Sequence, residues 1–223
     1  MKSWISFKNK SSKELFNDDI LITDINIGQP KLKTYTVDVS YANSVLDFSL
    51  VNGAVYENRI ITIKIYLEGE NKTDLRNKKY SMLNEWLTSN KLEKLFISTI
   101  ENFYFLGKVT SITIDKEYFK SAEITITFEV EPYKYAIKDE IIEKTVYNGD
   151  AILLPNLNMP TSPVVTSSVP ITLIFNDKNI QYPKGTYKNY DLTLSAGYNK
   201  VVINLAAGLT SANIKIEYKK GVL

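Results

Sequence analysis

Two segments of the chain alternate strictly between apolar and polar positions, and this alternation limits the fold more than any other feature of the sequence. Residues 61–67 read Ile-Thr-Ile-Lys-Ile-Tyr-Leu, and residues 124–131 read Ile-Thr-Ile-Thr-Phe-Glu-Val-Glu. Successive side chains of a strand point to opposite faces, so each segment predicts a strand with one dry face and one wet face. Pro132 is expected to end the second strand. A third alternating segment, residues 35–41, has Tyr35, Val37, Val39 and Tyr41 as its apolar side. The fold class predicted is mainly β.

Residues 73–89 depart from this pattern. Their apolar positions recur at helical spacing, Thr73 is placed to cap the first turn, and Asp74 lies near the positive helix end. We therefore predict one amphipathic helix that covers one side of the N-terminal sheet, and a partner-binding groove helix is the alternative. The apolar positions are Leu75, Met82, Leu83, Trp86 and Leu87.

The composition changes after about residue 136. Five of the seven prolines lie between Pro155 and Pro183, with short apolar runs and turn signals between them. Short strands at regular spacing are typical of a small β-sandwich. We predict an N-terminal β-rich domain with one helix over residues 1–136, a linker over 137–144, and a C-terminal β-sandwich over 145–223.

The sequence lacks the residues that most enzyme and metal sites require. It contains no Cys and no His, which excludes a disulfide framework, a Ser-His dyad, and zinc sites that use Cys or His. Its nine glycines form neither a dinucleotide fingerprint nor a phosphate-binding loop, and no Ser-x-x-Lys occurs. We expect no enzyme activity, no cofactor and no metal. Paired carboxylates of a glycosidase, Glu129 and Glu131, are conceivable, but a solvated strand face explains them more simply.

Charge and hydropathy argue against specific nucleic-acid binding and against membrane insertion. Lys and Arg number 27 against 25 Asp and Glu, and only Arg59 and Arg76 are arginines, whereas base readers use several. The N-terminus lacks the apolar stretch of a signal peptide, and four prolines make the uncharged residues 151–176 a poor membrane helix. We expect synthesis in a host cytoplasm and no membrane insertion.

Tyrosines of the C-terminal part allow two interpretations. They could form the stacking platform of a sugar-binding sandwich, with Tyr187 and Tyr190 as weak carbohydrate contacts, or they could be core and rim residues, which we favour. A carbohydrate-binding or host-adhesion module built from two β domains is therefore the alternative function. The tyrosines are Tyr182, Tyr187, Tyr190, Tyr198 and Tyr218.

An ordered set of segments resembles the distal tail proteins of long-tailed bacteriophages. Residues 41–48 and 56–63 look like the family's central signature, and the opening residues 5–12, the helix ending in Trp86-Leu87 and the strand closing at residues 128–133 agree with it. Residues 197–201 and 214–218 are similar to the last strands of the family's galectin-like domain. This chain has Ala42 and Ser44 where the family usually carries glycines.

The resemblance implies a structural hub at the tail tip of a virion. Six copies would form a ring through the N-terminal domain, between the tail tube protein above and the tail-associated hub protein below, and double-stranded DNA would pass through the lumen. The galectin-like domains would point outward, where a cell-surface polysaccharide is a possible partner. Ring contacts join different patches of neighbouring copies, and exposed edge strands suit them. Our candidate structural or ring-interface residues are Asp47, Asn58 and Arg59. Arg59 is the main candidate, because the fork of an arginine can bind a carboxylate with two hydrogen bonds.

Overall fold

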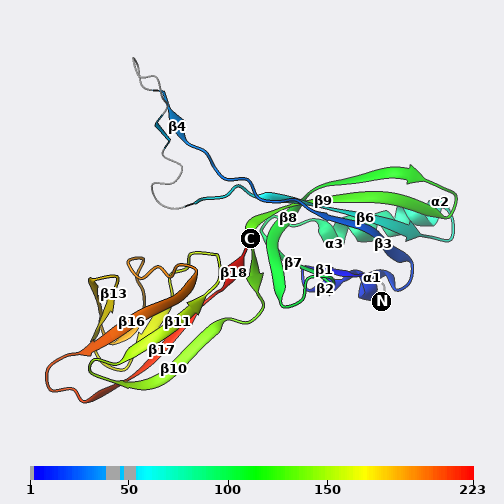
Figure 1. Ribbon diagram of the computed structural model, residues 1–223. Coiled ribbons are helices and arrows are strands. Elements are labelled where there is room, and N and C mark those ends of the chain that lie inside the picture. The colour runs from blue at the N-terminus through cyan, green and yellow to red at the C-terminus, as the bar shows by residue number, and fades with distance from the viewer. Residues whose placement is uncertain (1–2, 39–45, 48–53) are drawn as a thin grey trace. The chain divides into compact units, whose positions relative to one another are not determined.

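A computed structural model describes residues 3–38, 46–47 and 54–223 of the chain (Figure 1). The chain forms two compact units, Met1–Lys134 and Tyr135–Leu223. Strands make up most of both units, which confirms the predicted fold class. The boundaries predicted from composition stay a prediction, and residues 140–144 of the expected linker lie in a strand.

The first unit is built on one long, mostly antiparallel sheet, in which the strand order is β2-β1-β7-β8-β9-β6-β3. Its strands are β1 (Ile5–Phe7), β2 (Lys10–Ser11), β3 (Ile20–Ile27), β6 (Arg59–Glu68), β7 (Glu93–Ile97), β8 (Phe103–Glu117) and β9 (Ser121–Ala136). Over residues 61–67 of β6 and 124–131 of β9 the apolar positions Ile, Leu, Phe and Val are buried and the residues between them are more exposed, which confirms the predicted alternation. The two strands pair from Arg59 with Val130 to Glu68 with Ser121, so their dry faces form one surface.

Strand β9 does not stop at Pro132, so this prediction is wrong. The strand continues to Ala136. Its ladder with β6 ends at the pair Arg59 and Val130, so a proline two residues later interrupts no hydrogen bond of that ladder.

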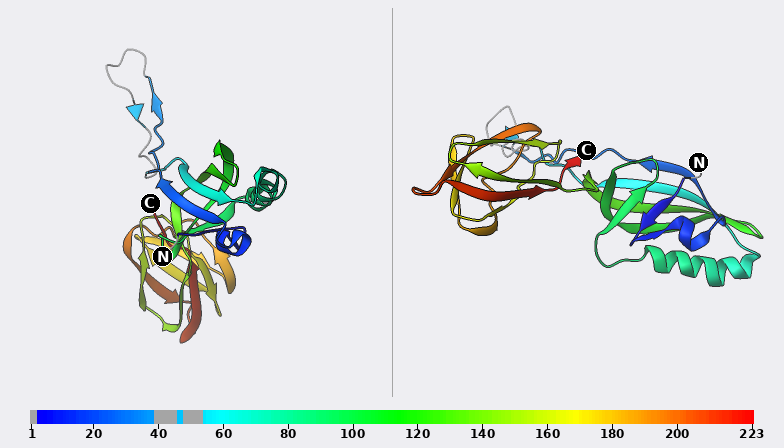
Figure 2. Two further views of the ribbon diagram at one scale, coloured as in Figure 1. Left: turned by 90° about the vertical axis from the view of Figure 1, so that its right-hand side faces the viewer. Right: turned by 90° about the horizontal axis from the view of Figure 1, so that it is seen from below.

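The predicted helix is present as one helical segment in three parts, which covers the dry face of the sheet (Figure 2). It comprises α2 (Lys72–Asp74), a π-helical turn η1 (Leu75–Lys79) and α3 (Tyr80–Leu87). The predicted cap at Thr73 is wrong, because the helix begins earlier and the Asn71 side chain accepts the Asp74 N–H at 3.0 Å. A second short helix, α1 (Ser12–Phe16), was not predicted; Ser11 and Glu14 close its first turn as a capping box.

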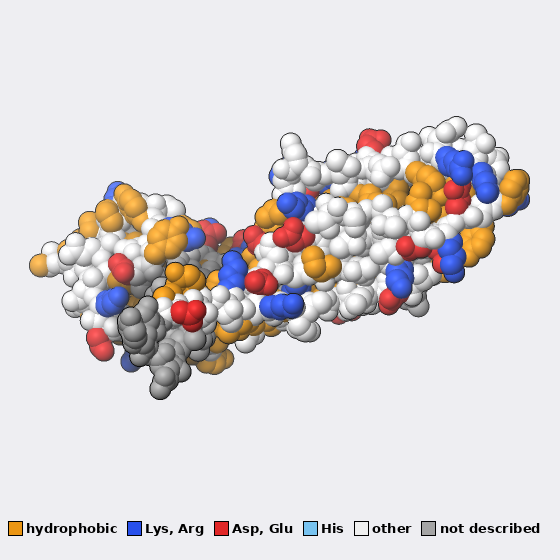
Figure 3. Space-filling model, turned by 90° about the horizontal axis from the view of Figure 1, so that it is seen from above, with side chains coloured by type: hydrophobic (Ala, Val, Ile, Leu, Met, Phe, Trp, Pro, Cys, Tyr) orange, Lys and Arg blue, Asp and Glu red, His pale blue; other side chains and the backbone are white. Residues whose placement is uncertain are grey.

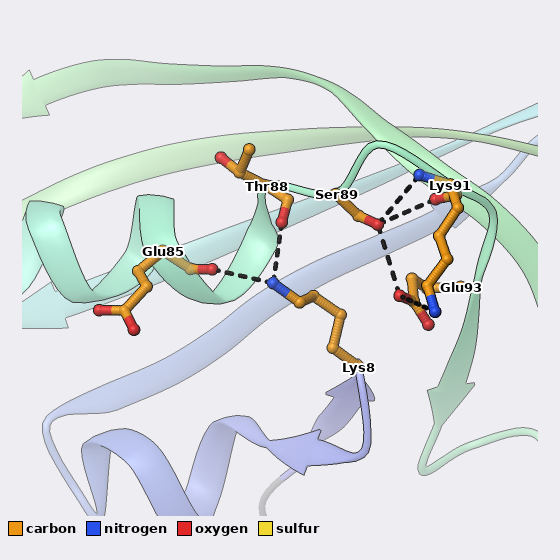
Figure 4. Close-up of polar contacts among 6 residues, drawn as sticks. All are labelled: Lys8, Glu85, Thr88, Ser89, Lys91 and Glu93. Carbon is orange, nitrogen blue, oxygen red and sulfur yellow. Dashed lines mark hydrogen bonds and ion pairs between the residues drawn. The ribbon is translucent and has the colours of Figure 1, made fainter.

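The end of α3 is fixed on the turn between β1 and β2. The Trp86 indole N–H donates to the Phe7 carbonyl oxygen at 2.9 Å. The Lys8 ammonium donates to the carbonyl oxygens of Glu85 and Thr88 at 3.2 and 2.9 Å (Figure 4). A cation at this end satisfies carbonyls that have no partner within the helix and favours the helix dipole. The turn therefore sets where the helix lies on the sheet.

Gly107 marks the place where β8 leaves β7 and continues along β9. β8 pairs with β7 only from Phe105 to Gly107. A Cβ at Gly107 would lie 2.4 Å from the Glu129 carbonyl oxygen and 2.7 Å from the Val130 Cα. Only glycine permits two backbones to approach this closely.

Between β3 and β6 the chain makes an extended two-stranded arm. Its base is held by hydrogen bonds from Lys33 N–H to Val55 O and from Glu57 N–H to Lys31 O, each 2.8 Å long. Farther out, β4 (Thr36–Val37) pairs with β5 (Leu46–Asp47). The predicted dry side of residues 35–41 is wrong where it is described, because Tyr35 is 66% exposed and Val37 is also exposed. Val39, Tyr41, Ala42 and Ser44 lie outside the described residues.

The second unit is a β-sandwich of two four-stranded sheets around one core. The strand orders are β10-β17-β12-β15 and β11-β16-β13-β14. Both sheets contribute to a common set of buried side chains that includes Val165, Leu173, Val201 and Ile216. The strands are β10 (Glu140–Tyr147), β11 (Ala151–Asn156), β12 (Val164–Ser167), β13 (Ile171–Phe175), β14 (Lys178–Tyr182), β15 (Gly185–Lys188), β16 (Gly197–Leu205) and β17 (Ser211–Tyr218), and the short β18 (Gly221–Val222) follows β17 in the chain.

Candidate assembly surface of the N-terminal unit

The part of the N-terminal sheet formed by β8, β9, β6 and β3 has two open edges. β3 pairs only with β6, and β8 beyond Gly107 pairs only with β9, counting the strands that the structure describes. An open edge presents a row of backbone N–H and C=O groups that can pair with another chain. β3, β6 and β9 are successively antiparallel, and β8 and β9 form a hairpin, so the two edge strands run in opposite directions.

The outward face of this part of the sheet is mostly polar, carries charges of both signs, and includes the exposed apolar side chains of Leu21 and Ile60. Lys64 and Thr62 of β6 lie opposite Thr125 and Thr127 of β9. In the view of Figure 3, Lys and Arg side chains lie among Asp and Glu side chains, with no large field of one sign. Such a face attracts neither a polyanion nor a polycation strongly.

Arg59 lies at the start of β6, at the base of the arm, and is only 4% exposed. Its Nη2 donates to the Pro132 carbonyl oxygen, and its guanidinium lies 5.6 Å from the centre of the Phe105 ring. Burial lowers the pKa of Arg59, and its Nε has no hydrogen-bond partner among the described residues. Arg59 thus joins β6, β8 and β9 through a carbonyl and a ring. Its role between copies stays a prediction.

The bidentate arginine–carboxylate pair of this unit is made elsewhere. Arg76 Nε and Nη2 each donate to a carboxylate oxygen of Glu117 at 3.0 Å, which ties the helical segment to the end of β8. The hydrogen bonds with Arg76 lower the pKa of Glu117. Sequence reasoning missed this pair, although Arg76 is one of only two arginines, because 41 residues separate the partners along the chain.

The other candidate residues lie apart from this pair. Asn58 Nδ2 donates to a Glu129 carboxylate oxygen at 3.0 Å, so Glu129 accepts a hydrogen bond on the outer face of the sheet. Asp47 belongs to β5, and its side chain is outside the described part. The ring role of Asn58 and Asp47 stays a prediction.

A groove of about 860 Å³ lies beside the start of β3. One side of the groove, next to strands β1 and β7, is lined by Trp4 and Phe96. The side next to α1 is lined by Glu14, Asn17 and Asp18, and Ile20 of β3 also lines the groove. Two carboxylates stand against one lysine, Lys13, so the groove carries a small negative charge.

The tyrosines of the second unit divide between core and surface. Tyr182 and Tyr218 are buried; burial, followed by the charge of Asp191, raises the pKa of Tyr182 to about 12, and burial raises that of Tyr218. Tyr187 and Tyr190 are 44% and 76% exposed, and the Lys188 ammonium lies 5.3 Å from the centre of the Tyr190 ring. The five tyrosines therefore do not form one platform, and sugar contact by the two exposed ones stays a prediction.

Within the described residues, no three acidic side chains group closely enough to hold a metal ion. The helices of that same part are too short and too polar to span a membrane.

Comparison with known proteins identifies the family. Residues 9–130 match the model of the phage tail protein RIFT-related domain. The chain is similar to the Dit protein (gp 19.1) of phage SPP1, whose crystal structure is described as a paradigm of the hub adsorption apparatus in phages that infect Gram-positive bacteria. The alignment covers 98% of this chain and 99% of the SPP1 chain. The TM-score is 0.64 at 10% sequence identity, which shows a shared fold across both units.

Two structures of the phage P2 baseplate, in its activated conformation with Ca and with Sr, align at a TM-score of 0.46 and 10% identity. They cover 99% and 97% of this chain and 98% of each matched chain, and at this score they carry no argument. No curated protein matches the chain. The family match and the shared fold confirm the predicted resemblance: this chain belongs to the phage tail proteins with a RIFT-related domain and has the fold of a distal tail protein.

Proposed function

We propose that six copies of this chain form a ring at the tail tip, which joins the tail tube to the hub protein below and lets DNA pass. The observation that carries the proposal is the pair of open edges on the N-terminal sheet. The edges are different strands, so a contact between them is heterologous and can close into a ring. The number six comes from the resemblance to distal tail proteins.

The directions of the edge strands support closure into one barrel. Because β3 and β8 run in opposite directions, β3 of one copy placed beside β8 of the next forms an antiparallel pair, like every other neighbouring pair in this part of the sheet. Each copy then contributes β8, β9, β6 and β3 to a closed wall. Closure removes the open edges that would otherwise promote aggregation.

The arm supports the same arrangement. A two-stranded ribbon is only marginally stable by itself in water. This one exposes the apolar side chains of Leu32, Tyr35, Val37 and Val55. A neighbouring copy in the ring would cover these four side chains.

The polar outer face of the four-stranded part suits the lining of a DNA passage. Its dry face is already covered by the helical segment, so the face with Thr62, Lys64, Thr125 and Thr127 is the one left for a lumen. Strong DNA binding requires many cationic contacts with phosphates, and a face of mixed charge lacks them. We assign no catalytic activity to either unit.

The oligomeric state of the full chain tests this proposal. Light scattering combined with size exclusion is expected to give a mass of about 150 kDa for six copies of the 25.4 kDa chain, and negative-stain images are expected to show sixfold rings. The tail tube and hub proteins are added if the ring forms only with its partners. A monomer under all of these conditions contradicts the ring.

A further inference from the structure

Two unexplained features of the N-terminal unit lie at the same end of its sheet. One is the groove beside Ile20, and the other is the tip of the β8–β9 hairpin, residues 118–120. Ile20 pairs with Leu67, and Leu67 pairs with Ala122, which directly follows the first residue of β9. Ile20, at one side of the groove, therefore lies at the β3 edge, and the tip lies at the β8 edge, of one end of the sheet.

The tip presents an apolar side chain on a fixed backbone. Phe119 is 67% exposed. The turn that carries it is closed by a hydrogen bond from Tyr118 N–H to Ser121 O at 2.7 Å, and the Tyr118 hydroxyl donates to Glu123 at 3.0 Å. Lys120, beside Phe119, is also exposed. A large exposed aromatic residue on an ordered turn is a typical anchor of protein interfaces.

The groove matches the tip in size, polarity and charge. Its aromatic residues Trp4 and Phe96 can pack on a third ring, and Glu14 and Asp18 give it the charge opposite to that of Lys120. A volume of about 860 Å³ is several times that of one Phe side chain, so the turn can enter with its neighbours.

We propose that the β8–β9 tip of one copy docks in the groove of the next copy, with Phe119 between Trp4 and Phe96 and with Lys120 near Glu14 and Asp18. This inference rests on the proposed ring. In a single chain, three strand spacings of about 4.8 Å each separate the edge strands β3 and β8, which places the tip at least roughly 14 Å from Ile20 at the edge of its own groove. Pairing of β8 with β3 of the next copy reduces this separation to about one spacing.

Introduced cysteines test the contact directly, because the chain has none of its own. We would prepare the full chain with Asn17→Cys and Lys120→Cys together, check the rings by negative stain, and treat them with a short bis-maleimide. The proposal predicts covalent species up to the hexamer in a denaturing gel. The single variants Asn17→Cys and Lys120→Cys are the matched controls, and neither is expected to give species larger than a dimer.

The outcomes separate the docking from the ring. Rings whose copies do not cross-link, or which cross-link only within one chain, overturn the docking and leave the ring intact. If neither rings nor cross-links form, even with the tail tube and hub proteins present, both proposals are contradicted.

A second variant tests the anchor. Phe119→Ser is expected to weaken association of the copies at least about tenfold, because a buried aromatic side chain is lost from the contact. Tyr190→Ser, which removes an exposed aromatic residue from the second unit, is the control and is expected to leave association unchanged. Equal association of the Phe119→Ser variant and the wild type, both folded by circular dichroism, would overturn the role of Phe119.

Discussion

Replacement of Gly107 by alanine tests the close approach of β8 to β9 at the point where β8 leaves β7. The added Cβ would lie 2.4 Å from the Glu129 carbonyl oxygen, 2.5 Å from Val130 Cγ1 and 2.7 Å from Val130 Cα. Two of these atoms are backbone atoms of a paired strand, so rotation of a side chain cannot relieve the clash. Overpacking of this kind costs about 1–3 kcal/mol and more where the backbone must move, and we expect about 3 kcal/mol for Gly107→Ala.

Tryptophan fluorescence measures this loss of stability in the first unit, where Gly107 lies. The two tryptophans of the chain, Trp4 and Trp86, both lie in the first unit. With a urea m-value of about 1.5–3 kcal/mol/M, a loss of about 3 kcal/mol lowers the midpoint of the fluorescence transition by about 1–2 M.

Gly208→Ala is the matched control for Gly107→Ala. Gly208 lies in the second unit, has nothing within 4 Å of an added Cβ, and has a φ of +86°, so its replacement costs about 1 kcal/mol through backbone strain alone. The tryptophan transition is expected to stay unchanged in this variant. If Gly107→Ala leaves that transition at the wild-type midpoint, the close approach of β8 to β9 is not what the structure indicates.

Four further substitutions test individual contacts. Trp86→Phe removes the indole donor from the β1–β2 turn, and unfolding of the first unit in urea is expected to require about 1–2 kcal/mol less. Lys8→Met removes the cation from the end of α3 and is expected to cost less than about 1 kcal/mol in the same assay. Tyr182→Phe and Tyr218→Phe form a pair in the second unit. Of the two hydroxyls, only that of Tyr218 has a hydrogen-bond partner among the described residues, the Pro155 carbonyl oxygen at 2.7 Å. Tyr218→Phe is therefore expected to lower the free energy of unfolding by about 1 kcal/mol, and Tyr182→Phe is expected to change it almost not at all at neutral pH.

Alkaline pH gives Tyr182 a separate signature. Its folded pKa of about 12 is higher than the ordinary value of 10, so the stability linked to its protonated form is complete below pH 10 and is lost between pH 10 and 12. Far-ultraviolet circular dichroism of the full chain is expected to show less alkaline destabilisation in Tyr182→Phe than in the wild type. Identical profiles would show that Tyr182 is not buried in its protonated form.

The sequence predicted the strands whose pattern is set by burial and missed features set by close approach. The alternation of β6 and β9 is visible because every second side chain enters the core. The effect of Pro132 depends on where the β6 ladder ends, and this register is not written in the residues around it. Similarly, the sequence around Gly107 does not show that β8 and β9 approach each other closely at this residue.

The arm shows why alternation alone can mislead. Residues 35–37 have the pattern of a half-buried strand, but among the described residues of this unit Tyr35 and Val37 are exposed. The pattern predicts that one face of the strand is buried, and it does not predict whether the same chain or another chain buries it. The same reasoning applies to the candidate site, because open edges, the groove and the tip depend on strand order, which the sequence does not give.

A cryo-electron microscopy map of the assembled ring tests the central claim most directly. We predict sixfold symmetry, with β3 of each copy paired antiparallel to β8 of its neighbour, and with the face that carries Thr62 and Thr127 lining the lumen. A particle without sixfold symmetry, or a sixfold ring whose copies meet through the C-terminal sandwich and leave both N-terminal edges open, would contradict the account.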